Sequence, residues 1–208
     1  FTPRTMSKRG VMLSSEFRYL DTRYNGEARY EVLPNDRVKG GDDRFAMSLR
    51  HAQQLGNGWN ANLNVQKVSD NNYFTDLSTQ IASTAQVLLP RQGAVSKGGN
   101  WWGDGTYGFS VGVQRWQTLQ PDPQNPTTPP YNQSTLSLSA AKQNVGPADL
   151  QFAGSLTDFT QPTMTNGKRA VAYPSIAAPL QSSFAYVTPK IGMHLTRYDF
   201  DQTNTTLG

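Results

Sequence analysis

The chain has no cysteine among its 208 residues and no apolar run long enough for a membrane-spanning helix. The first absence excludes disulfides, thiol catalysts and zinc–thiolate sites within these residues. The second excludes transmembrane helices, which need about 18 or more consecutive apolar residues. A transmembrane β-barrel stays open, because only every second residue of a barrel strand is apolar.

Charge is sparse as well, since 19 Lys and Arg against 15 Asp and Glu leave a formal net charge of +4. The basic residues are scattered and form no nucleic-acid footprint, so we expect no nucleic-acid partner. His51 and His194 lack metal-ligand spacing, and no serine stands in a nucleophile motif. We therefore expect no enzyme, no metal and no cofactor.

What the sequence has in abundance is strict alternation of apolar and polar residues. In residues 59–66 the apolar positions are Trp59, Ala61, Leu63 and Val65, and each polar position between them is Asn or Gln. A β-strand sends successive side chains to opposite faces, so this pattern predicts one apolar face and one polar face. The pattern recurs along the chain, and 18 Gly and 13 Pro supply turns. We predict an all-β fold, an antiparallel meander of about ten to eleven strands.

Turn residues set the expected boundaries of these strands. Six segments are predicted to be connections: 7–10, 25–26, 34–41, 56–58, 98–105 and 121–130. Residues 69–80 could hold a short helical turn, and 84–91 form the weakest predicted strand. The apolar residues of the last predicted strand have even numbers up to Tyr186 and odd numbers from Ile191 onward. An extra residue in the strand would cause this shift, so we predict a bulge near 188–190.

Two architectures fit such a two-faced sheet. A soluble protein would pack the apolar face inward, and Trp101 and Trp102 could then stack on sugars in a carbohydrate-binding module. A membrane barrel would turn the apolar face toward lipid and the polar face toward a lumen. Long strands, a polar face poor in lysine and the absence of covering helices favour the barrel. Aromatic residues gather near the expected strand ends, as in interfacial girdles: Tyr19, Tyr24, Trp59, Trp101, Trp102, Tyr107 and Trp116.

Ordered strings of the sequence resemble one known family. They are Arg9-Gly10, Glu16-Phe17-Arg18-Tyr19-Leu20, residues 33–38, Lys-Val-Ser-Asp-Asn-Asn-Tyr-Phe-Thr-Asp at 67–76, residues 144–147 and residues 174–180. Together they resemble the family of outer-membrane lipopolysaccharide-assembly proteins, also called the organic solvent tolerance family. The likeness runs from Thr2 to about Gln202, and its best-marked motif comprises Lys67, Val68, Ser69, Asp70, Tyr73, Phe74 and Asp76.

The resemblance implies a piece of a very large barrel in the outer membrane of a Gram-negative bacterium. Residues 1–208 would form a partial outer-membrane β-barrel domain from the second strand onward, without the N-terminal periplasmic domain and the C-terminal half of the barrel. The implied partners are lipopolysaccharide, a plug lipoprotein inside the barrel and membrane lipid. Periplasmic bridge proteins would be reached only through the missing N-terminal domain. Another outer-membrane channel, of porin or fatty-acid type, is the alternative within the same architecture.

The resemblance also implies roles for individual residues. Pro3 matches a proline beside the seam where the first and last strands meet, so it is the candidate lateral-gate proline. The motif at 67–76 is expected in a turn on the periplasmic side, where it braces the barrel or the plug. Nine residues are expected to face the lumen: Glu16, Arg18, Glu27, Arg29, Glu31, Arg50, Asn60, Asn62 and Asn64. Eight are expected to face lipid: Val11, Leu13, Phe17, Leu49, Leu63, Val65, Val111 and Val113.

Overall fold

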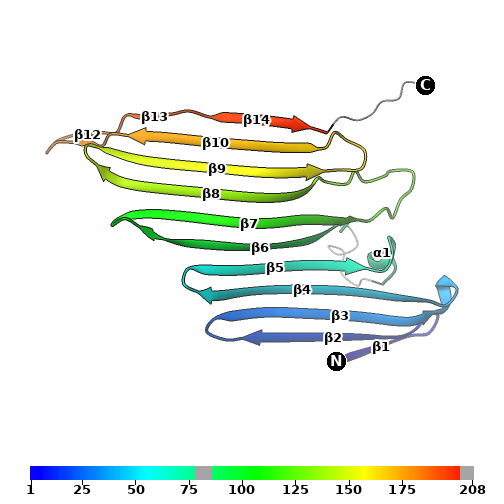
Figure 1. The fold of residues 1–208 in the computed structure, drawn as a ribbon. Coiled ribbons are helices and arrows are strands. Elements are labelled where there is room, and N and C mark those ends of the chain that lie inside the picture. Colours follow the sequence, from blue (N-terminus) through cyan, green and yellow to red (C-terminus); the bar gives the residue numbers. More distant parts are fainter. Residues whose placement is uncertain (78–85, 202–208) are drawn as a thin grey trace, which may run out of the picture. The chain divides into compact units, whose positions relative to one another are not determined.

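The computed structural model describes residues 1–77 and 86–201, and almost all regular structure in them is strand (Figure 1). One sheet has the order β1-β2-β3-β4-β5-β6-β7-β8-β9-β10, after which β13 and β14 both pair with β10. The neighbours follow chain order, and the strand pairs whose registers are given below are all antiparallel. This confirms the predicted all-β antiparallel meander.

The main strands are long, in line with the alternation that predicted them. Their bounds are β1 Thr2–Met6, β2 Gly10–Leu20, β3 Tyr24–Asp36, β4 Asp42–Gly56, β5 Trp59–Val68, β6 Leu88–Trp101, β7 Gly105–Thr118, β8 Asn132–Val145, β9 Ala148–Thr160, β10 Gly167–Ala177, β13 Lys190–Gly192 and β14 Leu195–Phe200. A separate hairpin joins β11 Leu180–Gln181 to β12 Tyr186–Val187. The helical segments are η1 Arg37–Lys39 and α1 Tyr73–Leu77. In the described part of the chain, no helix is long and apolar enough to cross a bilayer.

The chain divides into two compact units, and several strands contribute to both. The first unit comprises residues 1–54, 61–93 and 114–130, and the second comprises 55–60, 94–113 and 131–208. In the first unit Glu16 lies opposite Arg29, and Phe17 lies opposite Ala28. Since neighbouring residues of a strand point to opposite faces, this register gathers charges on one face and apolar side chains on the other.

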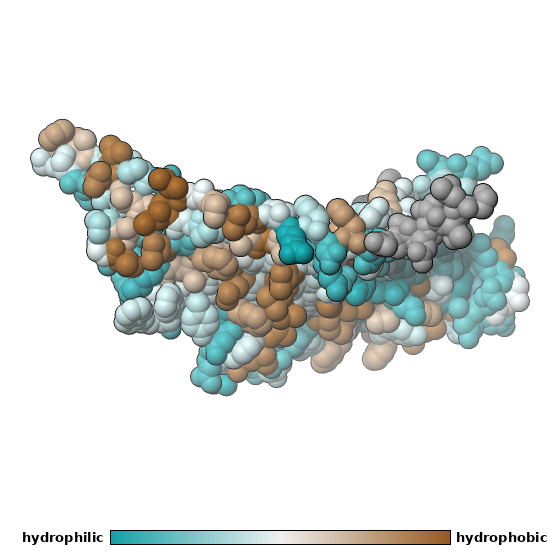
Figure 2. All heavy atoms as spheres, turned by 45° about the horizontal axis from the view of Figure 1, so that its top comes forward, coloured by the Kyte–Doolittle hydropathy of each residue, from teal (hydrophilic) through white to brown (hydrophobic). Residues whose placement is uncertain are grey.

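The apolar face of the first unit is exposed. Val11 is 52% and Phe17 is 64% accessible to solvent, whereas Leu63 and Val65 on β5 are half-buried. No second sheet covers this face among the described residues, and apolar side chains stand at the surface of the molecule (brown in Figure 2). A soluble sandwich would bury these residues, so their exposure favours the membrane architecture.

A small apolar core forms at one end of the first unit, around α1. Its members are buried and come from several strands and loops: Met12, Leu33, Val68, Tyr73, Leu77, Leu89 and Leu119. Leu33 shares its face with Glu31, and Glu31 pairs with Ser14 on the polar side of the sheet. The core therefore lies on the polar face, where α1 covers it.

The expected hairpin turn at Asn25 and Gly26 is wrong, because both residues lie inside β3 and the chain turns at 21–23. Gly26 serves another purpose. Its register partner on β2 is Tyr19, whose ring lies where a β-carbon of residue 26 would stand. The Tyr19 hydroxyl then meets Nδ1 of His51 at 2.7 Å. A glycine that indicates a turn by composition here makes room for an aromatic ring.

Other boundaries also differ from the expectation. Residues 34–36 continue β3, and residues 98–101 continue β6, so the connections at 37–41 and 102–104 are shorter than predicted. The weak strand expected at 84–91 begins only at Leu88, and residues 84–85 lie outside the described part. The helical turn expected within 69–80 is confirmed as α1, and 121–130 contain no strand.

The bulge expected near 188–190 is also wrong. Tyr186 belongs to the hairpin of β11 and β12, and the last strand starts afresh at Lys190. Where β13 gives way to β14, the Met193 amide donates to the Pro174 carbonyl at 3.0 Å. Pro174 has no N–H with which to return the bond, so the ladder breaks there without a change of register.

Candidate functional site

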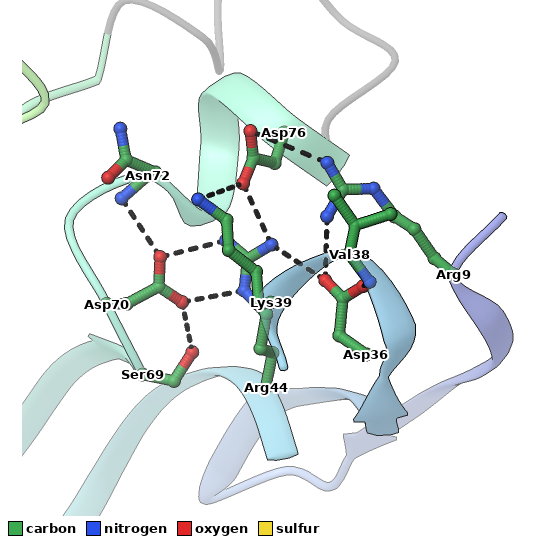
Figure 3. A network of polar contacts seen from close by, with 9 residues as sticks. All are labelled: Arg9, Asp36, Val38, Lys39, Arg44, Ser69, Asp70, Asn72 and Asp76. Carbon is green, nitrogen blue, oxygen red and sulfur yellow. Dashed lines mark hydrogen bonds and ion pairs between the residues drawn. The ribbon is translucent and has the colours of Figure 1, made fainter. Parts of the chain in front are cut away.

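Arg44, near the start of β4, lies at the centre of a buried ion-pair network (Figure 3). Its guanidinium binds Asp70 through two parallel hydrogen bonds, from Nε to Oδ2 and from Nη2 to Oδ1, both 2.8 Å long. Nη1 donates to Asp36 at 3.2 Å and to Asp76 at 3.0 Å. The planar fork of arginine suits this bidentate geometry, whereas lysine could not reproduce it.

Two further cations complete the network. Arg9 donates to Asp36 at 2.7 Å and lies 3.6 Å from Asp76, and the Lys39 ammonium lies 3.3 Å from Asp76. Three cations thus face three carboxylates. Asp36 also accepts from the Val38 amide at 3.0 Å, so the same carboxylate caps η1. The network joins the β1–β2 turn, the β3–β4 connection, β4 and the segment around α1.

Burial makes the centre of this network sensitive to the loss of Arg44 or Asp36. The side chains of Arg44 and Asp36 are 3% and 0% exposed. Charges taken out of water are stable only when each is paired and hydrogen-bonded, and here each is. Burial alone would raise the pKa of Asp70, but hydrogen bonds from Arg44 and Ser69 outweigh it and hold that pKa below its usual value.

The network fixes α1 on the polar face of the sheet. Tyr73 is 1% exposed, and its hydroxyl donates to Glu31 on β3 at 2.9 Å. Burial, and the nearby negative charge of Glu31, raise the pKa of the Tyr73 phenol, so it stays protonated as the donor. At the other end of α1, Arg4 on β1 donates to the Leu77 carbonyl at 2.8 Å. The helix, which follows β5 in the chain, is therefore attached to β3 at its start and to β1 at its end.

Beside α1, the polar face carries a charged quartet of Glu16, Arg18, Glu27 and Arg29. Arg29 lies 2.8 Å from Glu27 and 3.2 Å from Glu16, and Arg18 contacts the same two carboxylates. Unlike Arg44, the Arg18 side chain is 65% exposed. A hollow of about 550 Å³ lies between this face and α1, with Ser14, Glu31, Ser48, Arg50 and Tyr73 in its lining. The hollow is open, polar and of mixed charge.

The structure places the predicted site residues as follows. Glu16, Arg18, Glu27 and Arg29 come together in the quartet, Glu31 holds Tyr73, and Arg50 lies opposite Glu27. Asn60, Asn62 and Asn64 alternate along β5 with the apolar positions. Pro3, in β1, lies opposite Leu13 of β2. Among the described residues, no strand pairs with the other edge of β1, and Pro3 does not contact the ion-pair network.

The residues of the 67–76 motif have different tasks. Asp70 and Asp76 bind Arg44, Ser69 donates to Asp70 at 2.7 Å, and Val68 and Tyr73 enter the core. Phe74 packs against that core. Lys67 lies exposed, with its ammonium 5.6 Å from the centre of the Phe45 ring.

Sequence reasoning missed the other members of this network, among them Arg9, Asp36 and Arg44. Arg9 and Asp36 stand in strings that resemble the family, but neither was predicted as a site residue, and Arg44 belongs to no such string. One available signal was the position of Arg44, which alternates with Phe45 and Met47 and so falls on the polar face. Nothing local shows that its partners lie 26 and 32 residues further along the chain.

Replacing Arg44 with Met in the full-length protein is expected to destabilise it by about 2–3 kcal/mol, because Asp70 loses two hydrogen bonds and buried Asp36 keeps only Arg9 and the Val38 amide. Unfolding by urea in detergent, followed by tryptophan fluorescence, measures the loss. Arg18→Met in the exposed quartet is the matched control, with an expected cost of about 1 kcal/mol or less. Equal losses for the two variants would contradict a buried structural role for the network.

Comparison with known proteins adds the family. The family model described as LPS transport system D matches residues 42–207. The LPS-assembly protein LptD of Nitrosomonas eutropha is 41% identical over 96% of this chain and 27% of its own length. The proteins of the same name from Nitrosomonas europaea and Azoarcus sp. are also 41% identical, over 97% of this chain and 28% and 24% of their own lengths.

The chain thus spans about a quarter of the length of these curated relatives. The model match covers most of the chain and includes the Arg44 network except for Arg9, Asp36 and Lys39. The chain belongs to the LPS transport system D family, LptD.

Proposed function

We propose that this chain forms part of the wall of an outer-membrane barrel that inserts lipopolysaccharide into the outer leaflet. The observation that carries the proposal is the two-faced sheet, whose apolar face is exposed and whose polar face carries the charges. The relatives are named for LPS assembly, and members of the family are outer-membrane proteins of Gram-negative bacteria. A porin-type channel is not favoured by this family membership.

Each face meets a different environment in this proposal. The apolar face, including Phe17, Leu63 and Val65, contacts lipid. The polar face lines the lumen, with the nine residues expected there: Glu16, Arg18, Glu27, Arg29, Glu31, Arg50, Asn60, Asn62 and Asn64. Mutual pairing within the quartet suits a wet lumen, because exposed ion pairs need little further compensation. A soluble carbohydrate-binding module would leave the exposed apolar face unexplained.

The partners follow from the same arrangement. Lipopolysaccharide is the substrate, membrane lipid surrounds the apolar face, and a plug lipoprotein occupies the lumen beside the polar face. The periplasmic bridge proteins contact other parts of the whole protein. The ion-pair network holds α1 on the lumen side, so we assign the 67–76 motif to bracing the barrel wall. The role is transport, without a catalytic step in this part of the chain.

Two neighbouring residues of β5 test which face meets lipid. In full-length protein, Leu63→Arg is expected to destabilise the folded barrel by about 2–4 kcal/mol, because it puts a charge on the lipid face. Asn62→Arg, one residue away on the opposite face, is expected to fold and to deliver lipopolysaccharide normally. Heat-modifiable gel mobility measures folding, and surface-exposed lipopolysaccharide in cells depleted of the native protein measures delivery. Failure of Asn62→Arg together with tolerance of Leu63→Arg would reverse the two faces.

The order of the strands favours one orientation across the membrane. The turns at 21–23, 57–58, 102–104 and 146–147 lie at one end of the strands, which we call the turn end. The connections 7–9, 37–41, 69–87, 119–131 and 161–166 lie at the other, the loop-rich end. The resemblance makes β1 the second strand of the whole barrel, so the first strand rises from the periplasmic domain and β1 returns toward it. We therefore propose that the loop-rich end, with the 67–76 motif, faces the periplasm, as the resemblance implies.

Cysteine labelling in intact cells tests this orientation. With the turn end outward, Thr22→Cys in full-length protein is expected to react with a membrane-impermeant maleimide. Gln124→Cys, which is also exposed but lies at the loop-rich end, should react only after the outer membrane is permeabilised. The unsubstituted protein gives the background. The reverse pattern would place the motif on the outer side.

Pro3 keeps its proposed role at the lateral gate. The resemblance puts its strand beside the seam, and proline there lacks the N–H that a ladder hydrogen bond would use. In full-length protein, Pro3→Ala restores a backbone donor and is expected to tighten strand pairing at the seam and slow lipopolysaccharide delivery. Thr5→Ala, on the same face of β1, keeps its N–H and is the control. Unchanged surface lipopolysaccharide and unchanged antibiotic permeability in Pro3→Ala would overturn the role.

A further inference from the structure

The first strand of the sheet has a short ladder. β1 forms five register pairs with β2, and Pro3 among them has no N–H to donate. The ladder between β2 and β3 has eight register pairs, and the one between β3 and β4 has eleven. On the other edge of β1, no strand of the described residues pairs with it. Backbone pairing therefore holds β1 less firmly than it holds the next three strands.

Side chains give β1 a second attachment. Arg4 and Met6 are half-buried, whereas the other three residues of the strand are exposed. Alternation puts these two side chains on the same face, which is the polar face because Arg4 lies opposite the core residue Met12. Met6 packs against the core around α1, and Nη1 of Arg4 donates to the Leu77 carbonyl at 2.8 Å. The burial of β1 is thus confined to the face that meets α1.

The Arg4 hydrogen bond goes to a carbonyl that the helix does not use. Leu77 is the last residue of α1, and the last four carbonyls of a helix have no partner within it. Leu77 is also buried, and a buried carbonyl without a donor costs free energy. Arg4 supplies that donor, and a charged donor makes the stronger kind of hydrogen bond. The contact therefore stabilises the end of α1 and the strand beneath it together.

Other contacts attach α1 to strands that lie beyond β2. The Tyr73 hydroxyl donates to Glu31 of β3, and Asp76 accepts from Arg44 of β4. In the order of the sheet, β2 stands between β1 and β3. A restraint on β1 therefore runs through α1 to β3 and β4, in parallel with the ladder to β2. All of these residues belong to the first unit.

We infer that Arg4 is the positioning residue of this strand: it anchors β1 on α1 and restrains it separately from its ladder. The inference rests on the proposed function, which puts β1 beside the seam. Two adjacent residues then act in opposite senses. Pro3 weakens the ladder, and Arg4 keeps the strand on the barrel wall when the ladder opens. Because the anchor holds the periplasmic end of β1, the strand separates from its outer end.

Hydrogen exchange of full-length protein in detergent tests the anchor. Arg4→Met is expected to speed amide exchange in β1 about tenfold, because a hydrogen bond from a charged donor is lost. Exchange in β9 and the midpoint of urea unfolding should hardly change, since the opening is local. Arg4→Lys keeps a charged donor and should restore part of the protection. Lys8→Met, in the exposed turn after β1, is the control. Unchanged exchange in Arg4→Met would overturn the anchor.

A second variant tests the path through α1. Tyr73→Phe removes the hydroxyl that binds Glu31, and it is expected to speed exchange in β1 although residue 73 lies on the helix. In the double variant with Arg4→Met the two effects should not multiply, because both interrupt the same path. Effects that multiply would mean that Arg4 acts without α1, contrary to the inference.

Antibiotic entry connects the anchor with the seam. In cells depleted of the native protein, Arg4→Met is expected to raise sensitivity to vancomycin, because a loosened seam leaves a gap in the wall. Arg4→Lys should lower that sensitivity again, and heat-modifiable mobility shows which variants are folded. Faster exchange together with unchanged sensitivity would support the anchor and overturn the place of β1 beside the seam, which belongs to the proposed function.

Discussion

The two-residue period of an extended strand is the constraint on which the rest of the molecule depends. It places Glu16 and Arg29 on one face and Phe17 and Ala28 on the other, and each neighbouring strand repeats the division. Hydrogen bonding of the backbone is completed within the sheet, so the faces are free to differ. One face can be apolar throughout without a core to cover it, which a bilayer permits and water opposes.

At the loop-rich end of the first unit this division gives way to a packed core. There a five-residue helix, too short to be stable alone, lies on the polar face. Arg44 compensates for the missing helical stability, since its three carboxylate partners come from the end of β3 and from both sides of the α1 start. Charge neutralisation and apolar burial act at the same place, so α1 and the strands beneath it form one structural unit.

The sequence was sufficient for the strands and their faces, and insufficient for their connections. Alternation in residues 59–66 located β5 to within two residues, because the period is a local property. Asn25 and Gly26 gave a wrong turn prediction, because the ring of Tyr19 that requires the glycine lies on another strand. The motif at 67–76 was recognisable, but its dependence on Arg44 was not, since ion pairs between distant residues have no periodic signature.

Pro174 has a consequence for the outermost strand of this sheet. Because the proline cannot donate, the strand from Lys190 to Phe200 is attached to β10 by two separate ladders, one of three register pairs and one of six. Each ladder can open without the other. Exchange of backbone amides should therefore begin at the short ladder, and a strand arriving during barrel assembly could zip onto the six-pair segment before the three-pair segment closes.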